Sequence, residues 1–240
     1  MLTERQRNIL KWIVKDYIEL AKPISSEFLE KKHKPGISPA TIRNEFQALT
    51  KKGYLLKPHT SSGRVPTDKA YRFFVDNLAE REFEKFEIGD FIEEKIKDCI
   101  EFLQNLTKSL AKISKALVFS YLKEKNLVFK EGWDEILKEP EFFEKECVFH
   151  FLEFVESFEK GIGKIKINSE IRVFIGKENF FPKGKEFSIL ISKCYLPKRK
   201  ETIFSILGPK RMNYNRNIGI LNSLRECFRN YERGRVKKRN

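Results

Sequence analysis

The sequence predicts an α+β protein with a winged helix-turn-helix at the N-terminus, a long linker helix and a C-terminal α/β domain. Three observations support this fold class. Apolar residues repeat at helical spacing ahead of a short hairpin in the first 80 residues, an a/d pattern of apolar residues follows, and strand-like runs bounded by Gly and Pro occupy the last third. The expected segments are residues 1–80, 81–120, 121–232 and a basic tail of 233–240.

Composition is typical of a globular protein. Of the 240 residues, 40% are hydrophobic and 13% aromatic, which excludes a disordered chain although 34% are charged. No apolar run approaches the roughly 20 residues of a membrane span. The first residues lack the apolar segment of a signal peptide, so we expect a cytoplasmic protein.

The net charge of +14 is unevenly distributed along the chain. Residues 1–80 carry a net charge of +6, residues 81–160 of −6 and residues 161–240 of +14. An acidic middle between basic ends indicates segments with different partners, and a basic surface attracts polyanions such as nucleic acid. Charge alone is equally compatible with solvated lysines.

The cysteines and histidines show no metal-binding spacing. Cys99, Cys147, Cys194 and Cys227 are too far apart for a C-x-x-C pair, and the three histidines add no ligand pattern. We expect buried free thiols in a reducing compartment, without a metal or cofactor. A Cys–His catalytic pair stays open as an alternative that has no local support.

The first segment begins with two predicted helices. Thr3 and Gln6 form a T-x-x-Q capping box, and apolar residues behind them repeat at helical spacing until Pro23 ends the helix. Ser25 or Ser26 can cap a short second helix.

The third helix is the most explicit in the chain. Ser38 is a favoured N-cap, Pro39 occupies the first helical position, and Gly53 follows as a C-terminal cap. The buried face is expected to contain Ile42, Phe46 and Leu49, and the opposite face Ala40, Arg43, Asn44, Gln47 and Lys51. Arg, Asn and Gln pair with guanine and adenine edges in the major groove. The same stripe is equally typical of an ordinary solvated helix face.

A hairpin follows this helix directly. Residues 54–56 and 64–66 are predicted to be short strands around a loop at 57–63. A hairpin after a recognition helix is the layout of a winged helix, and its small polar tip lets N–H groups and hydroxyls approach phosphates. The remaining DNA-binding candidates are Ser38 and Thr41 at the helix start and His59, Thr60, Ser61, Ser62, Gly63 and Arg64 on the hairpin.

These residues carry a resemblance to a known family. The strings Ser38–Glu45, Gly53–Leu55, Pro58–Lys69 and Tyr71–Phe73 resemble the HrcA family of heat-inducible transcription repressors. The match covers about the first third of the chain, and it is specific because it fixes a long ordered string. It resumes weakly at 129–142 and strengthens at 187–224.

The resemblance implies a dimeric winged-helix repressor that binds an inverted-repeat operator, the CIRCE element, ahead of chaperone operons. It also implies a GroE-type chaperonin as the partner that keeps the repressor active. Family members usually have a sensor-like domain of GAF type, interrupted by an inserted dimerisation domain. At 240 residues this chain is expected to lack the insert and some early strands, which leaves a reduced GAF-like domain.

The middle segment contains a candidate dimerisation helix. Apolar residues alternate steps of four and three, which is an a/d seam. They are Ile92, Ile96, Cys99, Leu103, Leu106, Leu110, Ile113 and Leu117. The pattern is equally compatible with a dimer seam that stands in for the missing insert and with a helix packed on its own chain.

The last segment is predicted to be an antiparallel sheet flanked by helices. Strands are expected at 171–175, 187–192 and 202–207, and a later helix at 218–231. An earlier helix is expected to contain Phe142, Val148, Phe149, Leu152 and Val155. Lys210 and Arg211 are expected in a structural turn, with anion binding as the alternative.

The leading functional hypothesis is a dimeric repressor without catalysis, in which Arg43, Asn44 and Gln47 read bases. The alternative is a winged-helix regulator controlled by a small-molecule ligand in the C-terminal domain. A nucleic-acid enzyme is least favoured, because the sequence lacks the acidic metal-ligand cluster that such chemistry usually needs.

Overall fold

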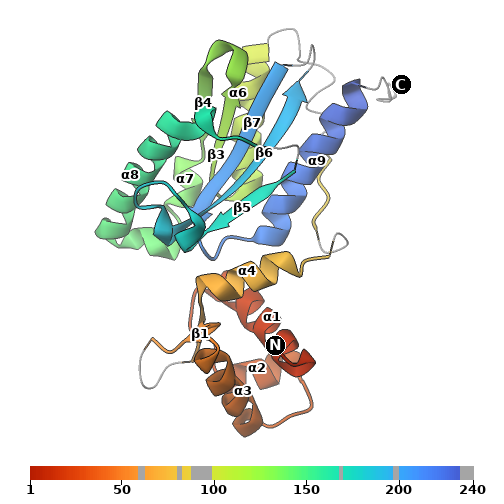
Figure 1. The fold of residues 1–240 in the computed structure, drawn as a ribbon, viewed down its shortest axis with the longest axis vertical. Helices are drawn as coiled ribbons and strands as arrows, with labels where there is room; N and C mark the ends of the chain where they lie inside the picture. Colours follow the sequence, from red (N-terminus) through yellow and green to blue (C-terminus); the bar gives the residue numbers. More distant parts are fainter. Residues whose placement is uncertain (59–62, 80–82, 88–98, 168–169, 197–199, 233–240) are drawn as a thin grey trace. The chain divides into compact units, whose positions relative to one another are not determined.

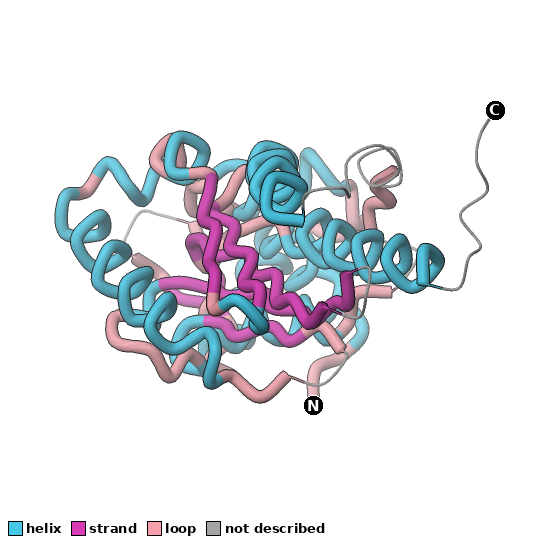
Figure 2. Tube along the Cα trace, turned by 90° about the horizontal axis from the view of Figure 1, so that it is seen from above, coloured by secondary structure: helices cyan, strands magenta, loops and turns pink. Residues whose placement is uncertain are grey.

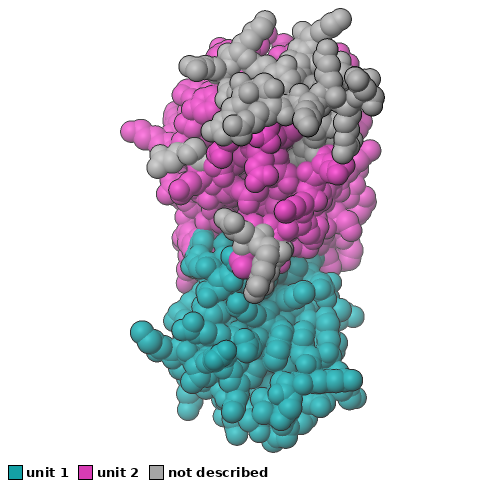
Figure 3. Space-filling view, turned by 90° about the vertical axis from the view of Figure 1, so that its right-hand side faces the viewer, with its two compact units in different colours: residues 1–78, 210–212 teal, residues 79–209, 213–240 magenta. Residues whose placement is uncertain are grey.

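The computed structural model describes residues 1–58, 63–79, 83–87, 99–167, 170–196 and 200–232 (Figure 1). The chain divides into two compact units, which Figure 3 shows in different colours. The first unit contains Met1–Leu78 with Lys210–Met212, and the second contains Ala79–Pro209 with Asn213–Asn240. Helices and strands both contribute to the fold, so the α+β prediction is confirmed.

The first unit places its helices ahead of a small hairpin, with one more helix after it. In chain order its elements are α1 (Glu4–Leu20), α2 (Ser26–His33), α3 (Pro39–Lys51), β1 (Leu55–Leu56), β2 (Val65–Pro66) and α4 (Asp68–Asp76). The predicted capping box opens α1: the Gln6 N–H donates to Thr3 Oγ1 at 3.2 Å, and Gln6 Oε1 accepts from the Thr3 N–H at 3.3 Å.

A buried carboxylate joins α1 to α2. Asp16 is fully buried, and its two oxygens lie 2.7 Å from Lys32 Nζ and 2.7 Å from His33 Nε2. Trp12 stacks on the His33 ring, with 4.9 Å between centroids. The hydrogen bond to Asp16 is the largest cause of the raised pKa of Lys32. A buried charge is tolerated only with such partners, so this cluster fixes how the two helices pack.

The second unit is built on one antiparallel sheet with the strand order β4-β3-β7-β6-β5. Its strands are β3 (Leu117–Leu122), β4 (Leu127–Glu131), β5 (Arg172–Ile175), β6 (Phe187–Leu196) and β7 (Lys200–Pro209). Among the described residues, its α-helices are α6 (Cys99–Ser114), α7 (Trp133–Ile136), α8 (Lys145–Gly161) and α9 (Tyr214–Glu232). Short 3₁₀ turns are η2 (Lys123–Lys125), η3 (Pro140–Phe143), η4 (Ile162–Lys164), η5 (Gly176–Glu178) and η6 (Gly184–Glu186).

Helices cover both faces of this sheet (Figure 2). Phe119 of β3 contacts Phe158 of α8 edge-to-face, with 5.2 Å between ring centroids. Phe204 of β7 stacks on Phe228 of α9 at 6.3 Å. Phe119 lies opposite Ser205 in the register, so the neighbouring Phe204 points to the other face. The sheet is therefore the middle of three layers, with α8 and α9 on opposite sides.

The three strands predicted in the last segment are confirmed, and β6 and β7 are longer than expected. β3 and β4 are additional strands that the sequence analysis did not predict. β3 pairs with β7 and with β4, so these two strands complete one half of the sheet.

The predicted linker helix is shorter than expected. α6 ends at Ser114, because Lys115 adopts a left-handed conformation with φ of 52°. Leu117, which was predicted to end the helix, instead begins β3 and is fully buried in the sheet. A segment boundary at residue 120 would divide β3, and α6 belongs to the second unit.

The described part of the predicted dimer seam is an intrachain contact. Leu103, Leu106 and Leu110 are at most 2% exposed, and α6 is tied to β3 by the hydroxyls of Thr107 and Ser120. Leucines that are already buried against their own sheet cannot pack on a second copy, which corrects the dimer prediction for these positions. Cys99 and Ile113 are half-buried, and Ile92 and Ile96 lie outside the described residues.

α8 confirms a predicted helix but presents a different face to the core. Phe151, Phe154 and Phe158 are at most 1% exposed, whereas Phe149 is 64% exposed and Leu152 45%. Two of the residues on which the predicted helix rested therefore face solvent, and a third, Phe142, lies before α8 in η3. Within the described residues, no helix is both long and apolar enough to cross a membrane.

Candidate nucleic-acid interface

The start of α3 is held by the cap that the sequence predicts. The Thr41 N–H donates to Ser38 Oγ at 3.2 Å, the Ser38 and Thr41 hydroxyls lie 3.0 Å apart, and Pro39 begins the helix. Gly53 follows the helix with φ of 76°, a conformation that favours glycine. Both ends of α3 are thus fixed by local interactions.

α3 turns one face to the core and the other to solvent. Ile42, Phe46 and Leu49 are at most 2% exposed, as expected. The predicted outer face contains Ser38, Ala40, Arg43, Asn44, Gln47 and Lys51, all exposed, and the half-buried Thr41. The structure therefore brings the predicted polar residues of α3 together on one accessible surface, which we call the α3 polar face.

An acidic residue of α2 lies beside this face. Arg43 Nη1 donates to Glu27 Oε1 at 2.7 Å, and both side chains are more than half exposed. The pKa of Glu27 is lowered, mainly by a backbone hydrogen bond, then by the Ser26 hydroxyl, with a smaller contribution from Arg43. The sequence does not reveal Glu27 as a neighbour of Arg43, since this proximity depends on how α2 and α3 pack.

The hairpin is anchored to the segment between α1 and α2. Ile24 and Arg64 exchange two backbone hydrogen bonds, of 2.9 and 2.8 Å, beside the antiparallel pair of β1 and β2. A Cβ on Gly63 would lie 2.2 Å from the Ile24 carbonyl oxygen. Gly63 is thus required for this close approach, a reason different from the predicted contact with phosphate.

The side chain of Arg64 lies over α3. Its Nε donates to Thr50 Oγ1 at 3.3 Å, and its guanidinium lies 6.0 Å from the centre of the Phe46 ring. Arg64 is half-buried, so reaching DNA requires it to leave these contacts. The hairpin candidates His59, Thr60, Ser61 and Ser62 lie outside the described residues.

Lys210 and Arg211 lie in a turn, as the favoured interpretation predicts. Lys210 Nζ lies 2.7 Å from Asp68 Oδ1, and Arg211 donates to the Ile18 carbonyl oxygen at 3.2 Å. Both side chains serve contacts within the first unit.

The described residues contain no group of three or more His, Cys, Asp or Glu arranged to hold a metal ion. All four cysteines are free thiols; Cys194 is buried, and the other three are only half-buried. Burial raises the pKa of Cys194 to about 12, and burial followed by nearby Glu186 and Glu141 raises that of Cys147 to about 11. Such thiols are poor nucleophiles at neutral pH, which opposes a catalytic role for either.

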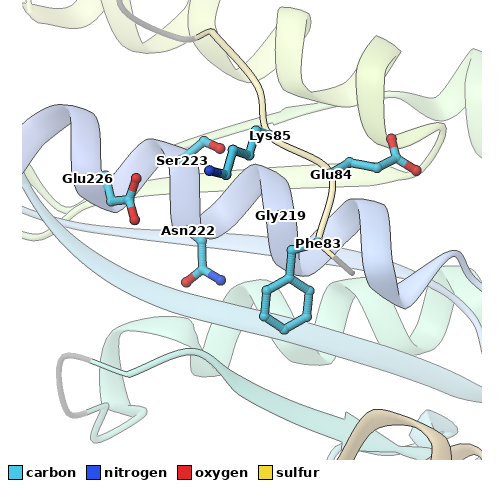
Figure 4. A pocket seen from close by; sticks show the side chains of 7 residues that line it. All are labelled: Phe83, Glu84, Lys85, Gly219, Asn222, Ser223 and Glu226. Atoms are coloured by element: carbon cyan, nitrogen blue, oxygen red, sulfur yellow. The ribbon is translucent and has the colours of Figure 1, made fainter. Parts of the chain in front are cut away.

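A pocket of about 390 Å³ lies in the second unit between α9 and residues 83–87 (Figure 4). The chain crosses α9 closely there: the Phe86 N–H donates to Ser223 Oγ at 3.1 Å, and a Cβ on Gly219 would lie 2.1 Å from the Glu84 carbonyl oxygen. The lining is mostly polar and consists of Phe83, Glu84, Lys85, Gly219, Asn222, Ser223 and Glu226.

Comparison with known families gives a clear match. The sequence profile described as the HrcA protein C terminal domain matches residues 59–218, which is about two thirds of the chain. The chain belongs to the HrcA family. The part of the chain that matches extends from the hairpin loop into α9, so it includes residues 129–142 and most of 187–224, which also carry the resemblance.

Some curated HrcA proteins match this chain over part of their length, and another matches over almost all of it. The heat-inducible transcription repressor HrcA of Acetivibrio thermocellus is 41% identical over 134 residues, which cover 54% of this chain and 38% of that protein. HrcA of Chloroflexus aggregans is 51% identical over 80 residues, 33% of this chain and 21% of that protein. These alignments cover well under two thirds of the relatives' length.

The HrcA of Brevibacillus brevis aligns over 329 residues at 27% identity, covering 94% of this chain and 96% of that protein. The alignment is longer than this chain of 240 residues, so the relative contains positions without a counterpart here. A crystal structure of a hypothetical protein has the same fold as this chain: the TM-score is 0.77 at 21% identity, over 95% of this chain and 99% of that one.

Proposed function

We propose that this chain is a DNA-binding repressor of heat-shock chaperone operons that binds an inverted-repeat, CIRCE-type operator as a dimer. The observation that carries the proposal is the α3 polar face, where Arg43, Asn44 and Gln47 are exposed opposite a fully buried face. Membership of the HrcA family, whose curated members are named heat-inducible transcription repressors, supports it.

The order of α2 and α3 followed by the β1–β2 hairpin supports the winged-helix interpretation of the first unit. In this proposal α3 enters the major groove. Arg43 pairs with a guanine edge, and the amides of Asn44 and Gln47 pair with adenine. Ser38, Thr41, Lys51 and the hairpin hold phosphates, which fixes the register of the protein on the duplex.

The second unit is proposed to be a reduced GAF-like sensor domain, as the family resemblance implies. A GroE-type chaperonin is proposed as the modulator that increases the operator-competent fraction, in a cytoplasmic setting. Adding chaperonin to the purified chain should raise the fraction that binds operator. An unchanged fraction would count against this partner.

The test of the function is a titration of the full chain against a duplex carrying the inverted repeat of a chaperone promoter and against a scrambled duplex. We expect Asn44→Ala to lose about 1–3 kcal/mol of operator binding while its binding to the scrambled duplex changes little. Asn105→Ala, the same change at an exposed position of α6, is the control. Equal affinity of the unchanged protein for both duplexes would contradict the proposal.

The pocket beside α9 favours a second candidate, a regulator controlled by a small ligand. Its volume falls within the range of roughly 300–1,000 Å³ of ligand sites, although its polar lining is less typical of them. A saturable, ligand-dependent rise in melting temperature, abolished by Asn222→Leu, would support this candidate.

A further inference from the structure

α8 carries an apolar pair that stays exposed in the part of the chain that the structure describes. Phe149 is 64% exposed and Leu152 45%, and both lie on the side of α8 opposite the buried Phe151 and Phe154. Figure 1 shows α8 at the edge of the second unit. Apolar side chains that are adjacent on an exposed helix face are typical of an interaction surface.

The same face carries charges at its two ends. Lys145, Phe149, Leu152, Glu156 and Lys160 follow one another at steps of three and four, so they form one stripe along the helix. All five are exposed. The stripe thus begins with a positive charge, has its apolar pair at the centre, and places Glu156 and Lys160 toward its C-terminal end.

This arrangement is self-complementary when two copies meet antiparallel. A two-fold axis between positions 150 and 151 places Phe149 opposite Leu152 of the second copy. The same axis places Lys145 opposite Glu156 of the second copy, and it does so at both ends of the interface. A parallel arrangement would instead place each charge beside its own equivalent.

We propose that the outer face of α8 is a docking surface for α8 of a second copy of this chain, packed antiparallel about a two-fold axis. The occupant follows from Lys145 and Glu156, which lie opposite each other only when the two helices run in opposite directions; the exposed Glu146 and Glu153 flank Phe149 and are not part of this match. Glu156 already accepts a hydrogen bond from Lys160 at 2.5 Å, and this bond is the main cause of its lowered pKa. The carboxylate is therefore held charged on the face that meets the second copy.

The resulting dimer is weak and depends on concentration. A stable dimer buries about 800 Å² on each partner, whereas one helix pair centred on two apolar side chains provides less. If the proposed function holds, an operator with two half-sites raises the effective concentration of the second copy and compensates for this small interface. The dimerisation itself is measurable without DNA, so it does not require the operator.

Charge reversal tests the interface, with sedimentation equilibrium of the full chain as the measurement. Lys145→Glu and Glu156→Lys each place like charges opposite one another at both ends, and each should raise the dimer dissociation constant by about tenfold or more. An equimolar mixture of the two variants should recover dimers, as should the chain with both changes, because opposite charges face each other again.

Both substituted side chains are exposed, so folding is expected to be retained, and circular dichroism verifies it. Glu124→Lys, an exposed change of the same charge on η2, should leave the dissociation constant unchanged. Phe149→Ser should weaken the dimer without involving charge. A chain that stays monomeric up to about 100 μM would overturn the proposal.

Two further results would also overturn it: dimers that are unaffected by either reversal, and a mixture that fails to recover. The first would assign the dimer to another surface. An α8 dimer that forms normally in a chain without operator preference would contradict the proposed function alone.

Discussion

The guanidinium of Arg43 donates to the carboxylate of Glu27 at 2.7 Å, so a negative charge of α2 lies beside a side chain proposed to read a base. Both side chains are more than half exposed, and such pairs contribute only about 0–1 kcal/mol to stability. The contact therefore acts mainly on the direction in which Arg43 points. Pairing with a guanine edge requires Arg43 to exchange this carboxylate for the base.

We expect Arg43→Ala to weaken operator binding by about 1–3 kcal/mol and to relax specificity at one base position. The reason is the loss of a bidentate contact in the major groove. Titration against operator variants, each with one substituted base pair, measures it. An equal loss on operator and scrambled duplexes would make Arg43 a phosphate contact instead. Glu27→Gln is the companion variant: it should leave the melting temperature nearly unchanged and strengthen binding to both duplexes.

Arg64→Ala should weaken binding to operator and scrambled DNA alike, and it should lower the salt slope of binding by about one unit. Arg64 also contacts Thr50 and the Phe46 ring, so the melting temperature is measured beside the affinity. Arg64→Lys, which keeps the charge but changes the donor geometry, should retain the slope. A slope that is unchanged in Arg64→Ala would remove this side chain from the DNA interface.

Gly63→Ala should destabilise the first unit by about 1–3 kcal/mol. The added Cβ would meet the Ile24 carbonyl and break the backbone hydrogen bonds between Ile24 and Arg64. Gly36→Ala is the matched control: Gly36 has φ of 73° but nothing within 4 Å of a Cβ. Gly36→Ala should lower the free energy of unfolding by only about 1 kcal/mol, the cost of placing alanine at a positive φ. Thermal unfolding compares the two. A Gly63→Ala protein as stable as the Gly36→Ala protein would show that the Ile24–Arg64 backbone pairing shifts to accommodate the added Cβ.

Cys194 should make the protein less stable at alkaline pH. Burial raises its pKa from 9.0 in the unfolded chain to about 12 in the folded protein. The free energy of unfolding is therefore unaffected by this thiol below pH 9 and decreases as the pH rises toward 12. The decrease is roughly 1 kcal/mol by pH 10. Urea unfolding at pH 8 and pH 10 should show this loss in the unchanged chain and in Cys99→Ala. Cys194→Ala should lack it; an equal loss in that variant would assign the effect to other groups.

The first unit could be predicted closely because its signals are local. Ser38 and Pro39 define the start of α3, and Thr3 and Gln6 that of α1, through contacts within three residues. The Arg43–Glu27 pair could not be predicted, since it depends on the packing of two helices. The candidate base-reading residues were identifiable as an exposed stripe, but the side-chain contacts of Arg64 were not.

The second unit was harder to predict because a fully buried strand lacks the alternation of apolar and polar residues. All six residues of β3 are buried, so the strand lacks the alternation that marks a half-exposed strand. The step from Ile113 to Leu117 also continues the helical pattern, and only the left-handed Lys115 ends the helix. In α8, aromatic residues occur on several sides, so the sequence does not show whether Phe149 or Phe151 faces the core.

The pairing of β3 with β7 has a consequence for how the protein is made. β3 meets β4 within a few residues, but its other neighbour follows roughly 80 residues later in the chain. At the usual rates of about 5–20 residues per second, the ribosome needs several seconds to deliver β7. During that time one edge of an apolar strand is open to pairing with other nascent chains. Heat raises the number of unfolded chains that can pair with this open edge. Newly made copies of this protein are therefore most prone to mispairing under the stress to which it is proposed to respond.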